Sequence, residues 1–334
     1  MMDRREDWLK LTVEKAIEPE MPICDPHFHF FNNPEIKYLM ADVLRDIKGG
    51  HNIVKNVYLD CHTGYRTTGP AAFRPVGETE FVVDLVAQNA KIIPEKIKIA
   101  AGIVSAADLN LGEAVGPVLA AHVAAGKGRF KGIRQEITPR GDPRIKPDPN
   151  VPRRCQAADK KFREGFSALR KLGLSFDTIL YLPHLAQLID LARAFPDTNI
   201  IINHAGIEPS GDSSPGVQAQ MTRDWQKAIV ALAACQNVYM KLGGFGMGLG
   251  INWHERPAPP GSAELAKAAA PYILWCIEKL GSQRCMFESN YPIESFDLPF
   301  NVVWNAFKLI TKDLPRKERN NLFYNTAVQA YRLD

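Results

Sequence analysis

Eight apolar segments of strand length constrain the fold of this chain more than any other feature. They are residues 23–30, 53–61, 97–104, 130–137, 174–181, 199–203, 238–242 and 284–289. Each of the first seven precedes a segment with apolar residues at helical spacing: 33–52, 80–90, 111–125, 160–172, 185–195, 218–235 and 263–280. Strands that alternate with helices predict a parallel sheet. Eight such units close a (β/α)₈ TIM barrel, and 334 residues suit one such domain. We therefore predict a single α/β TIM-barrel domain over residues 1–334, with extra C-terminal helices at 298–311 and 315–331.

The first strand carries three side chains that handle metals or protons. Asp25, His27 and His29 occupy every second position at the end of an apolar run. On an extended backbone these side chains project to one side, so two imidazoles can converge on one metal ion or one substrate. The alternative is a polar strand end with two hydrogen-bonded histidines. The pattern favours a reaction centre.

Reactive side chains also follow most of the other predicted strands, at the end where TIM barrels carry their active sites. The residues at these strand ends are His62, Arg134, Glu136, Tyr181, His184, His204, Lys241, Glu288 and Asn290. Arg134 either pairs with Glu136 or binds a substrate carboxylate through two hydrogen bonds. Lys241 is expected to extend its ammonium towards solvent, and His122, within a helix, to lie on the surface.

Two long loops are expected to border the same opening. Residues 138–154 form a polar, proline-containing loop, and such loops in compact domains are usually functional or disordered. The glycines of 243–250 do not follow the G-x-G-x-x-G pattern of a dinucleotide site, so we interpret 243–261 as a substrate lid that brings His254 towards substrate.

Composition limits the partners. The net charge of +4 comes from scattered Lys and Arg, which gives no support for nucleic-acid binding. The six cysteines form no C-x-x-C pair and are expected to be reduced. A charged N-terminus and the absence of a long apolar run predict a cytoplasmic protein without a membrane partner. The expected partner is a small-molecule substrate, and a homo-oligomer is compatible with the sequence.

Several motifs together resemble the amidohydrolase-related TIM-barrel hydrolases, in particular the branch with 2-pyrone-4,6-dicarboxylate lactonase and the sugar lactonases. The resemblance spans nearly the whole chain. It rests on 25–29 (Asp-Pro-His-Phe-His), 132–134 (Gly-Ile-Arg), 203–206 (Asn-His-Ala-Gly), 286–292 and the closing helix 325–331.

The eighth strand departs from the family pattern, which usually ends in an Asp that serves as general base and, in metal-dependent members, as a ligand. Asn290 occupies that position and cannot take a proton. Glu288, two residues earlier on the same strand face, is the nearest carboxylate that could act as base. The departure weakens the case for a metal, so the resemblance implies at most one divalent ion such as Zn²⁺, weakly bound or absent, at His27, His29 and His204.

The resemblance implies a hydrolase for a lactone or related cyclic ester from aromatic or sugar catabolism. His27, His29 and His204 would polarise the carbonyl, and a water activated by Glu288 or positioned by Asn290 would attack it. Substrate binding would fall to Arg134, Tyr181, His62 and His254. The alternatives are a metal-dependent decarboxylase of an aromatic or unsaturated acid and a non-catalytic binding protein on the same barrel.

Overall fold

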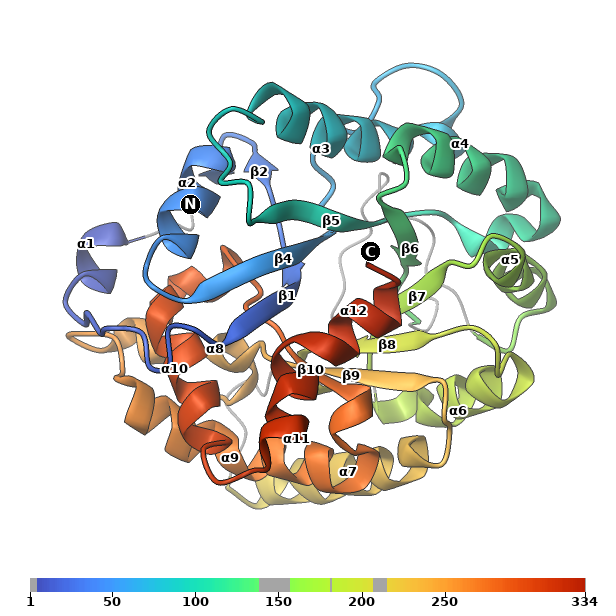
Figure 1. The fold of residues 1–334 in the computed structure, drawn as a ribbon. Coiled ribbons are helices and arrows are strands. Elements are labelled where there is room, and N and C mark those ends of the chain that lie inside the picture. Colours follow the sequence, from blue (N-terminus) through green and yellow to red (C-terminus); the bar gives the residue numbers. More distant parts are fainter. Residues whose placement is uncertain (1–4, 138–156, 181, 207–214, 334) are drawn as a thin grey trace.

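Eight parallel strands form one sheet in chain order, and the sheet curls into a barrel (Figure 1). The strands are β1 (Pro22–Phe28), β4 (Asn52–Leu59), β5 (Lys98–Ser105), β6 (Phe130–Arg134), β7 (Ser175–Ile179), β8 (Ile200–Asn203), β9 (Val238–Leu242) and β10 (Cys285–Phe287). This computed structural model describes residues 5–137, 157–180, 182–206 and 215–333.

The barrel closes where the chain leaves β1 and β10. The His29 N–H donates to the Tyr291 carbonyl at 2.8 Å, and the Asn290 N–H donates to the His27 carbonyl at 2.9 Å. These two bonds bring the ends of the first and last strands together at one rim. The TIM-barrel prediction is confirmed.

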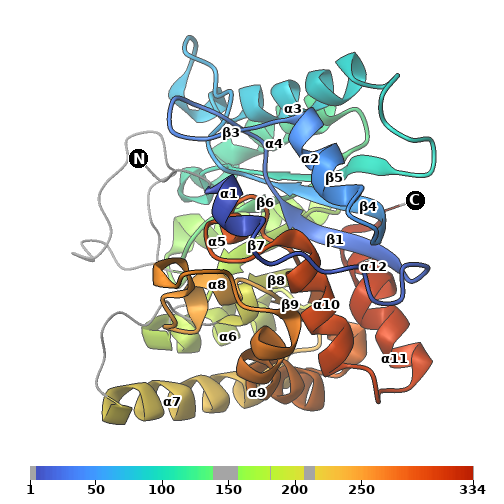
Figure 2. The same cartoon turned by 90° about the vertical axis from the view of Figure 1, so that its left-hand side faces the viewer.

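Helices cover the outside of the barrel (Figures 1 and 2). They are α3 (Val76–Gln88), α4 (Gly116–Gly126), α5 (Lys160–Lys171), α6 (Leu185–Ala194), α7 (Pro215–Ala233), α9 (Ser262–Leu280) and α10 (Phe300–Ile310). Strands covered on both faces are expected to be apolar throughout, and β8 is an example, since Ile200, Ile201 and Ile202 are all fully buried. The outer core lies between the strands and these helices.

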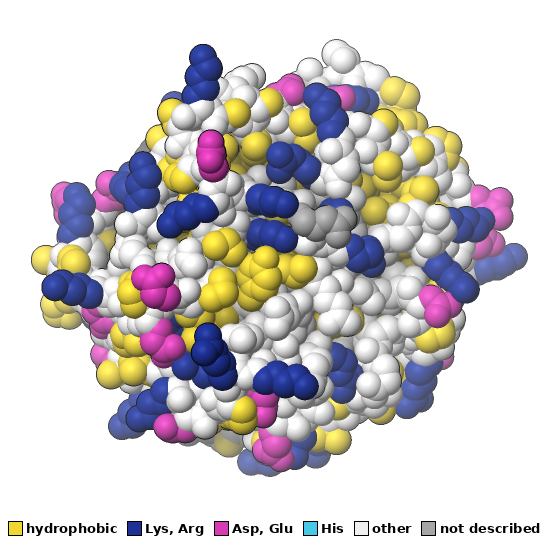
Figure 3. Space-filling model, in the orientation of Figure 1, with side chains coloured by type: hydrophobic (Ala, Val, Ile, Leu, Met, Phe, Trp, Pro, Cys, Tyr) yellow, Lys and Arg dark blue, Asp and Glu magenta, His cyan; other side chains and the backbone are white. Residues whose placement is uncertain are grey.

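The C-terminal helix α12 (Thr326–Tyr331) closes one end of the barrel. Its buried residues pack with the side chains that point into the barrel, which are Cys24, Val57, Leu59, Val104, Ile201 and Met286. Asn199, just before β8, donates to the Ala330 carbonyl at 3.0 Å, so α12 sits at the amino ends of the strands. Figure 3 shows this face, on which no histidine of the described residues is visible. The closing helix therefore covers the amino ends of the strands.

The connections differ from the predicted helices in several places. In place of one helix over 33–52, the chain forms an antiparallel pair, β2 (Phe31–Asn32) with β3 (Lys37–Tyr38), and then α2 (Met40–Ile47). The predicted helix 111–125 begins as a 3₁₀ segment, because Gly112 has a left-handed φ of 63° that an α-helix cannot accommodate. The segment 243–261 contains the short helix α8 (Phe245–Gly248) and a 3₁₀ turn.

The chain ends and one long loop complete the description. A short helix α1 (Glu6–Leu9) precedes β1, and α11 (Arg316–Asn320) runs through a π-helical turn into α12. The predicted loop 138–154 lies outside the described residues. None of the described helices combines the length and the apolar character that crossing a membrane requires.

The expectation that His122 lies on the surface is wrong. Its ring is fully buried and stacks on Phe130 with centroids 4.8 Å apart. Nδ1 lies 2.8 Å from the Thr79 hydroxyl, and Nε2 lies 3.1 Å from the Ala106 carbonyl. His122 is therefore a satisfied core histidine that joins α4 to α3 and to the end of β5.

Candidate active site

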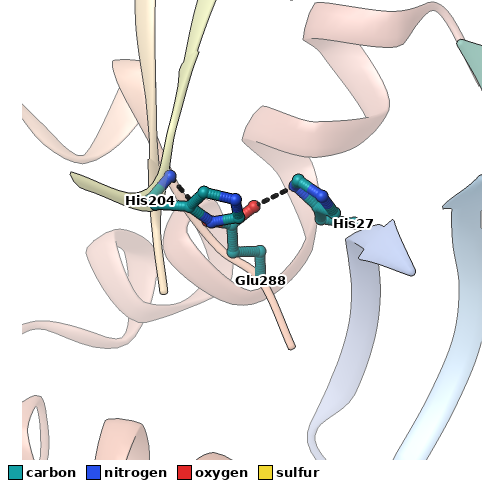
Figure 4. A group of neighbouring side chains, drawn as sticks. All are labelled: His27, His204 and Glu288. Atoms are coloured by element: carbon teal, nitrogen blue, oxygen red, sulfur yellow. Dashed lines mark hydrogen bonds and ion pairs between the residues drawn. The ribbon is translucent and has the colours of Figure 1, made fainter. Parts of the chain in front are cut away.

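Glu288, immediately after β10, lies between two imidazoles at the carboxyl ends of the strands (Figure 4). Its Oε1 lies 2.8 Å from His204 Nδ1 and also accepts from the His204 backbone N–H at 2.8 Å. Its Oε2 lies 2.5 Å from His27 Nδ1. Three separate strands, β1, β8 and β10, thus bring their reactive side chains to one point.

The contacts of Glu288 with the two imidazoles determine its charge, and burial determines that of His27. Burial acts to raise the pKa of Glu288, but His204 and His27 outweigh it and hold the pKa well below its usual range. Burial lowers the pKa of His27 well below its ordinary value, Glu288 opposes this, and the charge of Lys241 adds to it. Glu288 is therefore a carboxylate beside a neutral His27. His27 Nε2 is buried and has no hydrogen-bond partner within the described part of the chain.

The glycines after β9 make room for this arrangement. A Cβ on Gly243 would lie 2.5 Å from the Glu288 carbonyl oxygen. A Cβ on Gly244, whose φ is 72°, would lie 2.7 Å from Cβ and 2.8 Å from Cγ of His204. No side chain fits at such distances, so these two glycines let the backbone approach Glu288 and His204 closely. The start of the predicted glycine-rich lid is part of the site wall.

Four residues at the same rim have left-handed backbone angles. His204, Ala205, Asn290 and His62 all have positive φ angles, between 53° and 63°. Non-glycine residues adopt this left-handed region rarely, and they do so most often where the surrounding structure holds them for function. The strand ends therefore turn sharply at the predicted site residues.

A buried ion pair between Lys241 and Asp177 contacts His27. Lys241 Nζ is 2.8 Å from Asp177 Oδ1, and the Tyr331 hydroxyl donates to the same oxygen at 2.7 Å. Both charged side chains are fully buried, and Lys241 Nζ lies 3.5 Å from His27 Nδ1. Lys241 does not extend to solvent as the sequence led us to expect, because the carboxylate that attracts it lies inside the barrel. Polar contacts thus run from the closing helix α12 to His27.

His29 has both ring nitrogens engaged. Nδ1 lies 2.9 Å from the Leu59 carbonyl, and Nε2 lies 3.3 Å from the Asn290 side-chain amide. Burial, with the nearby Arg134 charge, lowers the pKa of His29 to about 3. Its ring packs edge-on against His27 with centroids 4.9 Å apart. Asn290 also contacts Glu294 Oε1 at 3.5 Å.

Asp25 ties β1 to the last strand. Its carboxyl accepts from the Ser289 N–H at 2.9 Å and from the Ser289 hydroxyl at 2.6 Å. Burial raises the pKa of Asp25 to about 7, against the hydrogen bonds from Ser289. Asp25 therefore holds Ser289, the residue after Glu288, against β1.

Arg134 and His62 gather around Asp60 at the end of β4. Arg134 donates to the Asp60 carbonyl and lies 3.9 Å from its carboxylate, and His62 Nε2 lies 3.5 Å from that carboxylate. Asp60 also accepts from the Tyr65 hydroxyl at 2.9 Å. Burial and the Asp60 charge raise the pKa of the neighbouring Glu78 well above its ordinary value. Asp60 therefore orients Arg134, which the sequence paired with Glu136 or with substrate.

Of the remaining expected residues, His254 contacts Asp297 and not Glu288 in the described part of the chain. His254 is half-exposed and directs both its backbone N–H and its Nδ1 to Asp297, at 3.0 and 2.9 Å. Tyr181 lies outside the described residues. Sequence reasoning missed Asp177, Ser289 and Glu294. Asp177 is a charged residue within an apolar strand, and that pattern is the one signal that could have found it.

The cluster can accommodate a metal ion. Each of His27, His204 and Glu288 offers one ligand atom, and these atoms all lie within 4.8 Å of one another. Imidazole nitrogen and carboxylate oxygen are the usual zinc ligands. The buried, unpartnered His27 Nε2 is the atom that such an ion would satisfy. His29, which the resemblance includes, lies outside this group of three, and Glu288 takes its place.

Comparison with known proteins assigns the family. The amidohydrolase family model matches residues 24–333, so this chain belongs to the amidohydrolase family. An uncharacterized protein, y4mH, of Sinorhizobium fredii is 31% identical over 338 residues, which cover 94% of this chain and 99% of the relative.

Two further comparisons concern function and fold. An L-fucono-1,5-lactonase of Burkholderia ambifaria is 26% identical over 180 residues, which are 53% of this chain and 56% of that protein. The crystal structure of an amidohydrolase from Burkholderia multivorans with bound zinc has a TM-score of 0.69 at 19% identity, covering 93% of this chain and 99% of that one. At this identity the likeness shows a shared fold. Family membership and the lactonase relative together support an enzyme of the hydrolase class.

Proposed function

We propose that this chain hydrolyses a small lactone or a related cyclic ester of an organic acid. The observation that carries the proposal is Glu288, which bridges His27 and His204 at the carboxyl ends of the strands. A carboxylate bound to Nδ1 of an imidazole leaves Nε2 of that ring free to act on substrate or water. The partial match to a fuconolactonase supports a lactone as the substrate class.

His204 is the group that we assign to take a proton from water. Its side chain is 17% exposed, whereas His27 and Glu288 are fully buried. Because Nδ1 faces Glu288, the Nε2 nitrogen of His204 is left to accept the proton. The oxygen of that water would then bond to the lactone carbonyl carbon. When the ring C–O bond breaks, His204 returns the proton to the leaving alkoxide, and the product is a hydroxy acid.

Glu288 then serves as the partner of the base. Both its oxygens already contact imidazoles, so a proton from water would reach the carboxylate only through a ring. Glu288 holds His204 in one orientation and stabilises the imidazolium that forms during the reaction. This arrangement replaces the family Asp, whose position is taken by Asn290.

Positive charge for the developing oxyanion would come from Arg134, whose side chain is 19% exposed and is held by Asp60. A divalent ion held by His27, His204 and Glu288 would supply Lewis-acid polarisation of the carbonyl when bound. In that loaded form His204 would be a ligand, and it would act as the base only in the metal-free site. His27, with its buried and unpartnered Nε2, would bind substrate or such an ion.

The proposal is tested by turnover of a lactone panel that includes aldono-1,5-lactones and 2-pyrone-4,6-dicarboxylate. Acid release is followed by a pH indicator, with and without added Zn²⁺. His204→Asn should lower kcat by roughly 10²–10⁴-fold, the usual cost of losing a general base. His184→Asn is the control, since this histidine contacts Gln187 and not Glu288.

The same assay separates the alternatives. Release of CO₂ from an aromatic acid, with no lactone hydrolysed, would favour the decarboxylase. Binding of a lactone or organic acid without turnover would favour a binding protein. Full activity in His204→Asn would contradict the assignment of the base.

A further inference from the structure

The hydrogen-bonding requirements of His29 determine the orientation of the Asn290 side chain. His29 Nδ1 faces the Leu59 carbonyl, which can only accept, so Nδ1 carries a hydrogen. His29 is buried, no carboxylate contacts it in the described part of the chain, and the nearest charge, Arg134, is positive. The ring is therefore neutral, and Nε2 is an acceptor that needs a donor.

The Asn290 amide is the group that faces this acceptor. Asn290 Oδ1 lies 3.3 Å from His29 Nε2. In this orientation of the amide, two acceptors would face each other. The oxygen and nitrogen of an amide occupy interchangeable positions, and their assignment follows from the hydrogen-bond network. Turning the amide by 180° places its nitrogen against His29 Nε2 and satisfies the imidazole. Asn290 Nδ2 lies 3.5 Å from Glu294 Oε1 before the turn, so the amide oxygen takes about that distance from Glu294 Oε1 after it.

Glu294 must then be a donor. Its Oε2 accepts from the Gly246 N–H at 2.8 Å, which leaves Oε1 as the oxygen that faces Asn290. A carboxylic acid donates from one oxygen, whereas a carboxylate donates from neither. Glu294 is 2% exposed, and the charged groups around it are Asp297 on the same turn and Glu288 beyond Asn290, with His254 paired to Asp297. Burial, and to a smaller extent Asp297 and Glu288, raise the pKa of Glu294 to about 8.

We propose that Glu294 is a positioning residue for the active site, which as a neutral acid donates to the Asn290 side chain and so fixes the amide that donates to His29 Nε2. The hydrogen bonds then run in one direction, from Glu294 to Asn290, to His29 Nε2, and from His29 Nδ1 to the Leu59 carbonyl. His29 packs against His27, so this chain of bonds supports the ring that Glu288 binds. The effect on catalysis rests on the proposed hydrolysis, whereas the hydrogen bond to His29 Nε2 does not depend on it.

Ionisation of Glu294 should break the chain. The carboxylate would attract the amide nitrogen of Asn290, which would turn the amide oxygen towards His29 Nε2 and leave two acceptors in contact. We therefore expect the site to lose order as the pH rises through about 8. Glu294→Gln replaces the acid by an amide that donates at every pH and still accepts from Gly246. Glu294→Met has a similar length and no donor.

The first experiment is ¹⁵N NMR of the histidine side chains in the full chain, without substrate. The wild-type His29 should show the neutral tautomer with hydrogen on Nδ1 at pH 6.5, and its signals should change with a midpoint near pH 8. Glu294→Gln should show the same Nε2 signal with no alkaline change, and Glu294→Met should show the Nε2 signal of a ring without a fixed donor at every pH. His29 signals that are identical in all three proteins would overturn the proposal.

The second experiment is the pH profile of kcat on any substrate that the wild type turns over. The wild type should lose activity above about pH 8, and Glu294→Gln should lack that loss. Glu294→Met should be slower by roughly 10- to 100-fold at all pH values. Asp297→Asn is the matched variant, because Asp297 raises the pKa of Glu294 without touching Asn290, and it should move the midpoint to lower pH. An unchanged alkaline loss in Glu294→Gln would contradict the proposal, whereas a chain without lactone turnover would contradict only the proposed function.

Discussion

Glu288 Oε2 lies 2.5 Å from His27 Nδ1, and both side chains are fully buried. The second carboxylate oxygen faces His204, so a single residue organises the two imidazoles. If the carboxylate holds the imidazoles, its loss should affect the rate more than the affinity for substrate. The rings would keep their places on β1 and β8 but lose the acceptor that fixes their protons.

The first prediction therefore concerns Glu288→Gln. We expect kcat to fall by roughly 10²–10⁴-fold with a smaller change in KM, because the amide cannot stabilise the imidazolium of the working base. Steady-state kinetics on a lactone substrate measures both constants. The free energy of unfolding of the same variant is the control that separates this effect from a folding defect. A variant with wild-type kcat would exclude Glu288 from both roles, base and partner of the base.

The second prediction concerns the buried pair of Lys241 and Asp177. Lys241→Met removes the cation and leaves a buried carboxylate with Tyr331 as its remaining donor. Breaking a buried ion pair from one side costs about 3–5 kcal/mol of unfolding free energy. Denaturant unfolding at pH 7 measures the loss.

The double variant Lys241→Met/Asp177→Asn is the control for this pair. It removes both charges, so it should recover most of the stability lost in the single variant. The loss in Lys241→Met should also be smaller at pH 5, where an unpaired Asp177 can take up a proton. If Lys241→Met were as stable as the wild type, the Lys241 cation would not be needed to offset the buried charge of Asp177.

Sequence patterns were sufficient to predict the barrel and the strand ends that bring His27, His204 and Glu288 together. Period-two and helical spacing located the eight strands, and the rule that active sites lie at strand carboxyl ends pointed to His27, His204 and Glu288. Their proximity follows from topology alone, because residues at the ends of parallel strands meet at one rim.

Contacts between distant segments could not be predicted in this way. Nothing in a local pattern joins Tyr331 in the last helix to Asp177, because the closing of the barrel by α12 is a tertiary event. His122 was placed wrongly for a similar reason: α4 is apolar around most of its circumference, so the sequence does not reveal which side faces the strands. The role of Glu294 depends on the left-handed turn at Asn290, which strand periodicity does not predict.

The third prediction concerns metal binding. If His27, His204 and Glu288 hold a divalent ion, His204→Ala should weaken Zn²⁺ binding by more than about 100-fold, since even residues that only support a metal ligand contribute 10- to 100-fold. Calorimetry on the metal-stripped protein measures the affinity. His184→Ala should bind Zn²⁺ as the wild type does. Equal affinity in His204→Ala and the wild type would place any zinc outside this cluster.

The last prediction concerns the pH dependence of stability and Asp25. Burial raises the pKa of this carboxyl from 3.8 to about 7 in the folded chain. Between these two values the folded state holds a proton that the unfolded state has released, so the free energy of unfolding must fall as the pH rises from about 4 to about 7. The difference between these two pKa values of Asp25 corresponds to a contribution of ~4 kcal/mol, which is fully present below pH 4 and lost above pH 7.

Asp25→Asn isolates that contribution, because the amide is neutral at every pH and can still bond to the Ser289 N–H and hydroxyl. Between pH 4 and 7 the unfolding free energy of the variant should therefore decline less steeply than that of the wild type, and above pH 7 the variant should be the more stable of the two. Denaturant titrations at four or five pH values give both curves. Parallel curves would mean that Asp25 releases its proton at the same pH in the folded and the unfolded chain. In that case the hydrogen bonds from Ser289 would stabilise the Asp25 carboxylate enough to offset the cost of burying it. A charged group would then join β1 to the residues after β10.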